Sequence, residues 1–268
     1  MSAALLLLAG TARAQGAKPL TRCAPDAVVS GTVCMDKYEA SVWRVPNATT
    51  TNRGLVLKIQ QGKATVALLT AGGATQLGLV YPPDYAPCAL NGQNCTDDIF
   101  AVSLPGVLPS AFITWFQAQA ACENARKRLP TNAEWQAAVA GTPVPDWSKP
   151  NDNGTTDCNT HSAHQAVATG SRSGCTSARG AFDMVGNLQE WVSDWVPQST
   201  ACGAWNTDVS PTGEQQCMGG AAATGEPSAL LRGGYAMSSS PSFRAGPLAV
   251  FGAAPSDPSY QFGFRCAR

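Results

Sequence analysis

Residues 114–140, TWFQAQAACENARKRLPTNAEWQAAVA, predict two short helices joined by a loop. Thr114 with Gln117, and Thr131 with Glu134, have the spacing of a capping box, in which each side chain of the pair satisfies a free backbone N–H group of the other residue. We expect the first helix to end near Arg126 and the second to run from about Asn132 to Ala140. The buried face of the first helix should consist of Trp115, Ala118, Ala121, Cys122 and Ala125.

The rest of the chain predicts short strands separated by much coil. Glycine and proline number 26 and 19 in 268 residues, a proportion typical of turns and long loops. Strand-like runs occupy Val33–Glu39, Ser41–Val45, Ala229–Gly234 and Gln261–Arg268. Leu55–Gln60 and Ala64–Thr70 alternate around residues 61–63 and predict a hairpin. With no repeat and no linker, the pattern favours one α+β domain rich in coil.

The composition excludes several classes of protein. The chain has 18 basic and 18 acidic side chains, a balance that argues against a nucleic-acid binder. Apolar residues make up 44% and charged residues 13%, so the chain is too apolar to be disordered. After the N-terminus, no stretch approaches the ~20 apolar residues that cross a bilayer.

The cysteines and the N-terminus both point to export. Ten cysteines include no Cys-x-x-Cys pair, which disfavours zinc ribbons, iron–sulfur clusters and thioredoxin chemistry and favours disulfides. Ala3–Ala9 is a short apolar run, and Ala12 and Ala14 follow it at the spacing of a signal-peptidase site. We therefore expect a signal peptide at residues 1–14, one domain at 15–268, and a secreted or periplasmic protein.

Five motifs occur in the order seen in one known family. They are CMDKYEAS at 34–41, KRLPTNAEW at 127–135, GNLQEW at 186–191, LRGG at 231–234 and GFRC at 263–266. With them the chain resembles the formylglycine-generating enzymes, also called sulfatase-modifying factors. The resemblance implies a C-type-lectin-like fold, with two helices on a small twisted antiparallel sheet. Residues 46–109 align poorly with the family, so the hairpin expected there is interpreted as an insertion. The resemblance also implies a disulfide between Cys122 and Cys266.

The other eight cysteines are assigned by proximity in sequence. This pairs Cys23 with Cys34, Cys88 with Cys95, Cys158 with Cys175, and Cys202 with Cys217. The alternative, in which some of them are free thiols, stays open.

The resemblance also implies calcium. The segment 183–190 offers two carboxylates and turn-prone carbonyls, which suit a hard, oxygen-seeking cation. Carried over from the family, the side chains of Asp183 and Glu190 and the carbonyls of Gly186 and Leu188 would bind Ca²⁺. The alternative is that Glu190 caps a turn and Asp183 is a solvated loop residue. A second family calcium loop would lie at residues 159–160, where a disulfide between the flanking cysteines could replace the metal.

His161 and His164 are the only histidines of the chain. They would meet on one face if their loop formed a helical turn, and a transition-metal site can then be imagined. Two imidazoles in a loop rich in glycine and serine are more often surface residues, and related iron enzymes need three histidines. The surface interpretation is therefore favoured.

The reaction of the family requires copper ligands that this chain lacks. Formylglycine-generating enzymes oxidise a substrate cysteine with O₂ at Cu(I), which two thiolates hold, and Cu(I) prefers sulfur. The two thiolate positions fall on Ser238 and Phe243, so copper and catalytic cysteines are not expected. The serines at 238–242 lack a nucleophile elbow. Arg232, Arg244 and Arg265 could bind an anion, but buried salt bridges are the favoured role.

Once copper chemistry is set aside, the C-terminal sequence favours a role in binding a ligand. The segment from Tyr235 to Tyr260 mixes Tyr, Ser, Phe and Arg with Gly and Pro, a composition suited to adaptable polar contacts and rigid aromatic anchors. We expect a calcium-stabilised module that binds a protein, a peptide or a glycan. The alternatives are a divergent oxidoreductase or other modifying enzyme of the same superfamily, and a purely structural exported protein.

Overall fold

The computed structural model describes residues 20–95, 99–143, 152–196, 228–236 and 245–268. Its helices are α1 (Arg53–Gln60), α2 (Val66–Ala71), α3 (Trp115–Asn124) and α4 (Asn132–Ala138). Its strands are β1 (Ala27–Ser30), β2 (Val33–Asp36), β3 (Ala40–Arg44), β4 (Thr75–Leu77), β5 (Ile99–Ser103), β6 (Gln189–Val196), β7 (Ser228–Arg232), β8 (Val250–Ala253) and β9 (Phe262–Phe264). The α+β class with much coil is confirmed.

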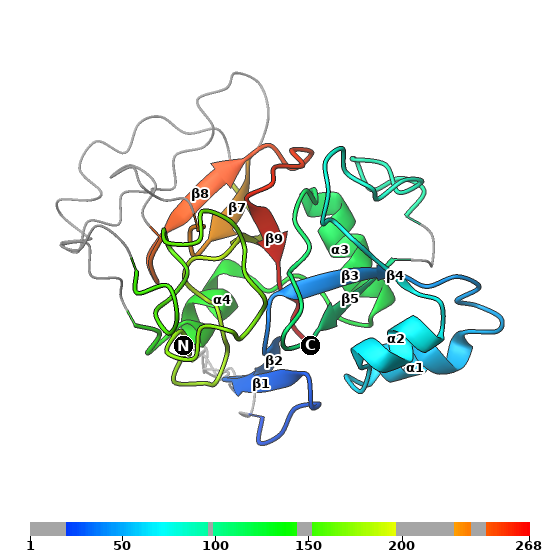
Figure 1. Cartoon of the computed structure of the whole chain (residues 1–268), viewed down its shortest axis with the longest axis horizontal. Coiled ribbons are helices and arrows are strands. Elements are labelled where there is room, and N and C mark those ends of the chain that lie inside the picture. The colour runs from blue at the N-terminus through cyan, green and yellow to red at the C-terminus, as the bar shows by residue number, and fades with distance from the viewer. Residues whose placement is uncertain (1–19, 96–98, 144–151, 197–227, 237–244) are drawn as a thin grey trace, which may run out of the picture.

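The strands form three small sheets in the described part of the chain (Figure 1). β1 pairs with β2, β3 lies between β4 and β5, and the largest sheet has the order β8-β7-β6-β9. All neighbours are antiparallel except β6 and β9, which run parallel. The expected antiparallel sheet is therefore only partly correct, because β9 pairs with β6 in the parallel direction.

The two predicted helices form where the capping boxes place them. In both α3 and α4 the Thr hydroxyl accepts from the backbone of the third helical residue, and that residue's side chain accepts from the Thr backbone. On α3 the residues Ala118, Ala121 and Cys122 are fully buried, as is Ala125 at its C-cap, while Trp115 is partly buried. The helix packs with β5, β6 and β9 around one core that includes Trp191 and Phe264. Figure 1 shows α3 and α4 on either side of β9.

The hairpin predicted near residues 46–109 is wrong, because Leu55–Gln60 lies in α1 and most of Ala64–Thr70 lies in α2, with Thr65 as its N-cap. The apolar side chains follow a helical period: Leu55 and Ile59, four residues apart, both pack on a core with Leu69. The hydroxyl of Thr65 accepts from Leu68 N and caps α2, and Gly62 ends the first helix with a positive φ of 67°. These helix signals outweigh the alternation that suggested strands.

Four disulfides join Cys23 to Cys34, Cys88 to Cys95, Cys122 to Cys266, and Cys158 to Cys175. These are the pairs expected from the sequence, and the described residues contain no free cysteine. Cys202 and Cys217 lie outside the described residues, as does the expected signal peptide.

A buried charge network ties the two ends of the described chain together. Lys127 Nζ donates to Asp26 and Asp36, at 2.7 Å each, and the side chain of Lys127 is fully buried. Arg268 reaches Asp26 at 2.9 Å, and its backbone pairs with that of Cys34. Figure 1 shows the C-terminus beside β2. No helix in the described ranges has the length and hydrophobicity needed to span a bilayer.

Candidate functional site

The predicted calcium residues lie in a tight loop that leads into β6. Asp183, Gly186 and Asn187 all have a positive φ, which is uncommon for residues with a side chain. A Cβ on Gly186 would lie 2.3 Å from the carbonyl oxygen of Asn159, so only glycine allows the two loops to approach this closely. The backbone thereby brings the segment 183–190 against the loop that carries Asn159.

Glu190 binds protein groups with both of its carboxylate oxygens. Its Oε1 accepts from Arg265 Nη2 at 2.5 Å, and its Oε2 accepts from Arg265 Nε at 2.7 Å and from Trp135 Nε1 at 2.6 Å. All three side chains are buried. Arg265 therefore serves as the counter-ion of Glu190, and both carboxylate oxygens of Glu190 already accept hydrogen bonds from the protein. The prediction that Arg265 forms a buried salt bridge is confirmed.

A third buried carboxylate, Glu39, stands beside Asp183 and Glu190. Its oxygens accept from Leu188 N at 3.0 Å and from Asn187 Nδ2 at 2.5 Å. Desolvation, together with the charges of Asp183 and Glu190, holds the pKa of Glu39 well above its ordinary value. Glu39 belongs to the motif at 34–41, but its sequence position gave no sign that it faces segment 183–190.

Asp183 forms no salt bridge in the described structure, and a single backbone N–H group donates to its carboxylate. Its Oδ2 accepts from Gly170 N at 2.7 Å, yet burial, with a smaller contribution from Glu190, raises its pKa to about 6. Three carboxylates thus share an interior in which Arg265 forms a salt bridge with Glu190, and the charges of Arg265 and Arg172 only partly offset the effect of burial on Asp183. Asp183 and the carbonyls of Gly186 and Leu188 remain suitable oxygen donors for a hard cation, although no cluster of three or more metal-binding side chains exists among the described residues.

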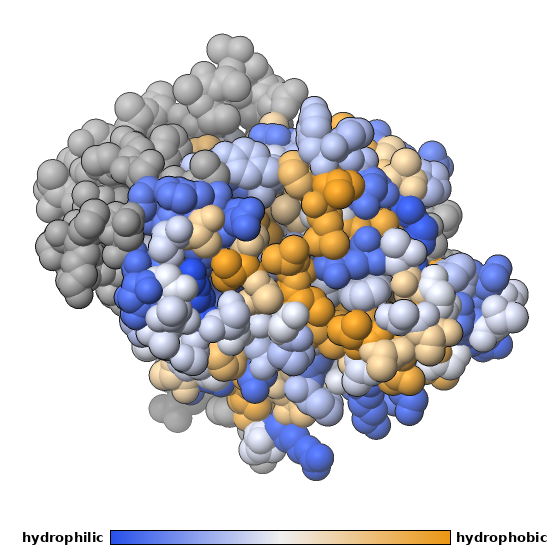
Figure 2. Space-filling model, in the orientation of Figure 1, coloured by the Kyte–Doolittle hydropathy of each residue, from blue (hydrophilic) through white to orange (hydrophobic). Residues whose placement is uncertain are grey.

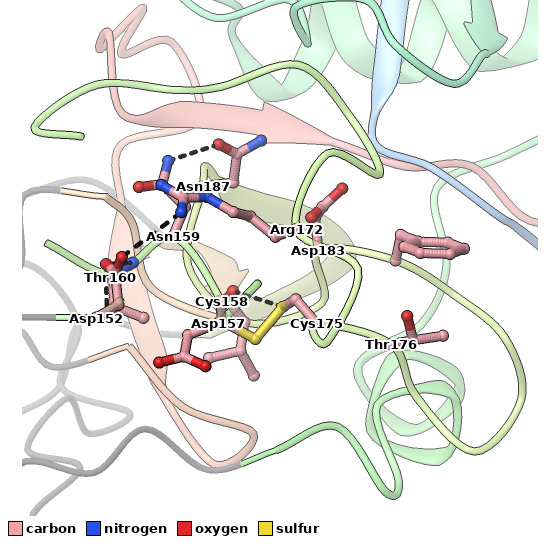
Figure 3. The surroundings of a disulfide bond; sticks show 12 residues. Asp152, Asp157, Cys158, Asn159, Thr160, Arg172, Cys175, Thr176, Asp183 and Asn187 are labelled. Carbon is pink, nitrogen blue, oxygen red and sulfur yellow. Dashed lines mark hydrogen bonds and ion pairs between the residues drawn. A yellow bond between two sulfur atoms is a disulfide. The ribbon is translucent and has the colours of Figure 1, made fainter. Parts of the chain in front are cut away.

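The neighbouring loop is organised by a carboxylate and a disulfide. Asp152 accepts from the backbone N–H groups of Thr160, His161 and Ser162 at 3.0, 2.8 and 2.9 Å. Asn159 donates to Asn187 Oδ1 at 2.9 Å. Figure 3 shows Asp152 beside Thr160, and Asn159 beside Asn187, close to the Cys158–Cys175 disulfide. Asn159 and Thr160, expected near a second calcium site, are held here by protein hydrogen bonds and the disulfide.

A different part of the molecule exposes aromatic side chains. We define the aromatic face as Tyr81, Phe112, Tyr235, Tyr260 and Gln261. The rings of Tyr81 and Phe112 lie 5.9 Å apart, and their exposed fractions differ, since Tyr81 is 78% exposed and Phe112 is partly buried.

One backbone hydrogen bond joins the two halves of the aromatic face, and a side-chain hydrogen bond lies within one of the halves. Phe112 N donates to Ser259 O at 3.1 Å, and Gln261 Nε2 donates to Tyr260 Oη at 2.9 Å. Partial burial and the nearby Tyr260 raise the pKa of Tyr235, which also shares a side-chain hydrogen bond with Gln261. In Figure 1 the β8–β9 connection lies next to the segments that precede α3, and Figure 2 shows an apolar band reaching this region.

The sequence predicts a recognition role for only part of the aromatic face. Tyr235 and Tyr260 bound the segment predicted for recognition, whereas Tyr81 and Phe112 come from a stretch that carried no recognisable pattern. The family thiolate positions, Ser238 and Phe243, lie outside the described residues, as does Arg244. Arg232 lies over the ring of Trp135, 4.8 Å from its centroid, which is a structural role.

Several solved structures and one family model are similar to this chain. The chain resembles solved structures of PvdO from Pseudomonas aeruginosa (18% identity, TM-score 0.39, covering 90% of this chain and 82% of that chain) and of CarF (16%, 0.36, 60% and 67%). It also resembles the I1 variant of the Major Tropism Determinant (18%, 0.39, 67% and 47%), so it spans about half the length of that protein. A search of curated proteins found no match. The model of the sulfatase-modifying factor enzyme 1-like domain matches residues 47–268, most of the chain, and the protein therefore belongs to that family.

Proposed function

We propose that this member of the sulfatase-modifying factor family is an exported module that recognises a protein or peptide segment through the aromatic face and has lost the copper oxidase reaction. The observation that carries the proposal is the exposure of Tyr81 and Tyr260, 78% and 48%. The ring of Tyr81 contacts that of Phe112, whose backbone N–H donates to Ser259, the neighbour of Tyr260. Exposed apolar side chains that group together, unlike ones scattered singly, mark interaction sites.

The chemistry of the aromatic face favours an uncharged, partly apolar segment as the ligand. Its five side chains include no Lys, Arg, Asp or Glu. Tyrosine provides a large contact area with few rotatable bonds, and Gln261 adds hydrogen-bonding capacity, a combination common in protein-binding paratopes. Gln261 Nε2 holds the Tyr260 hydroxyl, so less conformational freedom is lost when a ligand binds.

The loss of oxidase activity follows from the residue types at two positions. A serine hydroxyl at 238 stays protonated and a phenylalanine at 243 offers no ligand atom, so neither can hold Cu(I). Eight of the ten cysteines form disulfides in the described residues. The same disulfides support an oxidising compartment, secreted or periplasmic, for this protein.

Calcium stabilisation is part of the proposal, with a smaller ligand set than the family implies. Asp183 and the carbonyls of Gly186 and Leu188 would hold the ion, while Glu190 keeps its pair with Arg265. The support is electrostatic: buried carboxylates whose pKa values are raised are stabilised by a nearby cation. When bound, Ca²⁺ would supply charge and rigidity to the loop and no chemistry.

Selection from a displayed random peptide library tests the recognition proposal. Peptides enriched on the wild-type protein should lose at least tenfold in affinity when Tyr81→Ala or Tyr260→Ala is introduced. Leu57→Ala on α1 is the matched control, because Leu57 is similarly exposed at 49% and lies on a separate element. Its affinities should equal those of the wild type.

Two results would count against this assignment. One is a library that yields no peptide, and the other is a set of peptides that bind the tyrosine variants as well as they bind the wild type. Binding of the wild type to immobilised neutral glycans, with the same dependence on Tyr260, would move the ligand to a different class.

A further inference from the structure

The two histidines of the chain meet on one turn. The centroids of the His161 and His164 rings lie 4.7 Å apart, with their planes at 78°. His164 N donates to His161 O at 3.3 Å, and His164 has a positive φ of 53°, so the backbone turns sharply between them. From the sequence, this encounter is expected only if the loop forms a helical turn; the structure brings the rings together through a non-helical turn instead.

The turn is held in place by its surroundings. Asp152 accepts from the backbone of three consecutive residues, 160–162, and the adjacent Cys158 is joined to Cys175. Asn159 anchors the turn to Asn187. Because these contacts fix the backbone without a ligand, bringing the two rings together for binding costs little additional entropy.

One ring nitrogen has no partner in the protein. His161 Nδ1 is buried and forms no hydrogen bond, whereas buried polar atoms are nearly always satisfied. The ring of His161 is only partly buried and that of His164 is exposed, so the pair can be reached from solvent.

The ring spacing matches that of two imidazoles on one metal ion. A metal–nitrogen distance of about 2 Å, with roughly 1 Å more to the ring centre, places each centroid about 3 Å from the ion and two centroids about 5 Å apart at a tetrahedral angle. The observed 4.7 Å agrees with this value. We propose that His161 and His164 form a binding site for a divalent transition metal such as Zn²⁺, with solvent completing its coordination.

Ligand chemistry separates this site from the carboxylate cluster around Asp183. Imidazole nitrogen favours Zn²⁺, Ni²⁺ and Cu²⁺, while carboxylates and carbonyls favour Ca²⁺ and Mg²⁺. The histidine site is therefore independent of the calcium proposal and of peptide recognition, and Ca²⁺ should not compete for it.

Calorimetric titration of the tag-free protein with ZnCl₂ tests the proposal. We expect one equivalent of Zn²⁺ at micromolar affinity, unchanged by millimolar Ca²⁺, and at least tenfold weaker binding in His164→Gln and in His161→Gln. Asp157→Asn, an exposed carboxylate of the same loop, is the matched control and should bind as the wild type does.

A second readout does not depend on affinity. Electron paramagnetic resonance of the protein loaded with one equivalent of Cu²⁺ should show coupling to two nitrogens, and to one in His164→Gln. Because His164 is exposed, that variant tests the site even if His161→Gln fails to fold. Absence of saturable Zn²⁺ binding below millimolar concentration, or equal binding by wild type and His164→Gln, would overturn the proposal.

Discussion

Replacing Arg265 with methionine should cost far more stability than replacing Arg128 with methionine, although both arginines pair with a glutamate in two hydrogen bonds. Arg265 binds Glu190 at 2.5 and 2.7 Å with both side chains at most 1% exposed. Arg128 binds Glu134 at 2.6 and 2.7 Å with side chains 42% and 21% exposed. The comparison isolates the effect of burial.

The magnitude follows from what each change leaves behind. Arg265→Met would strand the buried carboxylate of Glu190, which costs about 3 to 5 kcal/mol. It would also remove donors from the carbonyls of Asp36 and Phe182, at 3.1 and 2.8 Å, so the upper end of that range is expected. For a chain of this size about 4 kcal/mol corresponds to roughly 8 to 16 °C in Tm. Arg128→Met should cost less than about 1 kcal/mol.

Urea denaturation of the oxidised proteins at pH 5 and pH 8 provides the assay. Arg265 lowers the pKa values of Glu39 and Asp183, so in the Arg265→Met variant both values should rise further. A carboxyl whose pKa is higher in the folded state binds more protons there, and stability falls as the pH rises through the interval between the unfolded and folded values. The loss caused by Arg265→Met should therefore be larger at pH 8 than at pH 5. Similar small losses in the two arginine variants, or a larger loss at pH 5, would refute the reasoning.

Three other outcomes can be checked. A chelator should lower the Tm of the wild type and leave that of Asp183→Asn unchanged, because a ligand that binds only the folded state stabilises it. If the chelator leaves the wild-type Tm unchanged, calcium stabilisation is refuted. Replacing Cys122 and Cys266 together with serine should cost about 4 to 5 kcal/mol in the chain-entropy model, since the disulfide joins residues 144 positions apart, and denaturant titration measures the loss. Incubation with Cu(I), O₂ and a Cys-x-Pro-x-Arg peptide should leave the peptide mass unchanged; conversion of its cysteine to formylglycine would show that the oxidase survives.

Local signals in the sequence predicted the local structure well. The capping boxes at Thr114 and Thr131 placed α3 and α4 to within two residues, because a helix N-terminus is set by side chains a few positions away. The alternation of apolar and polar residues at 55–70 wrongly predicted a hairpin where the structure has α1 and α2. A window of six residues fits both periods, and the packing of Ile59 and Leu69 on the core decided between them.

The sequence by itself determined the family, the starts of α3 and α4, and the disulfide pairs that short loops or a family motif imply. The tertiary structure alone decided which charges meet: Glu39 is about 150 residues from Glu190 in the chain, and no sequence pattern encodes that long-range contact. It likewise decided that Arg265 binds Glu190, that Phe112 lies beside Ser259, and that the two imidazole rings lie in contact. Such contacts depend on how distant loops are packed, so they arise only once the chain has folded.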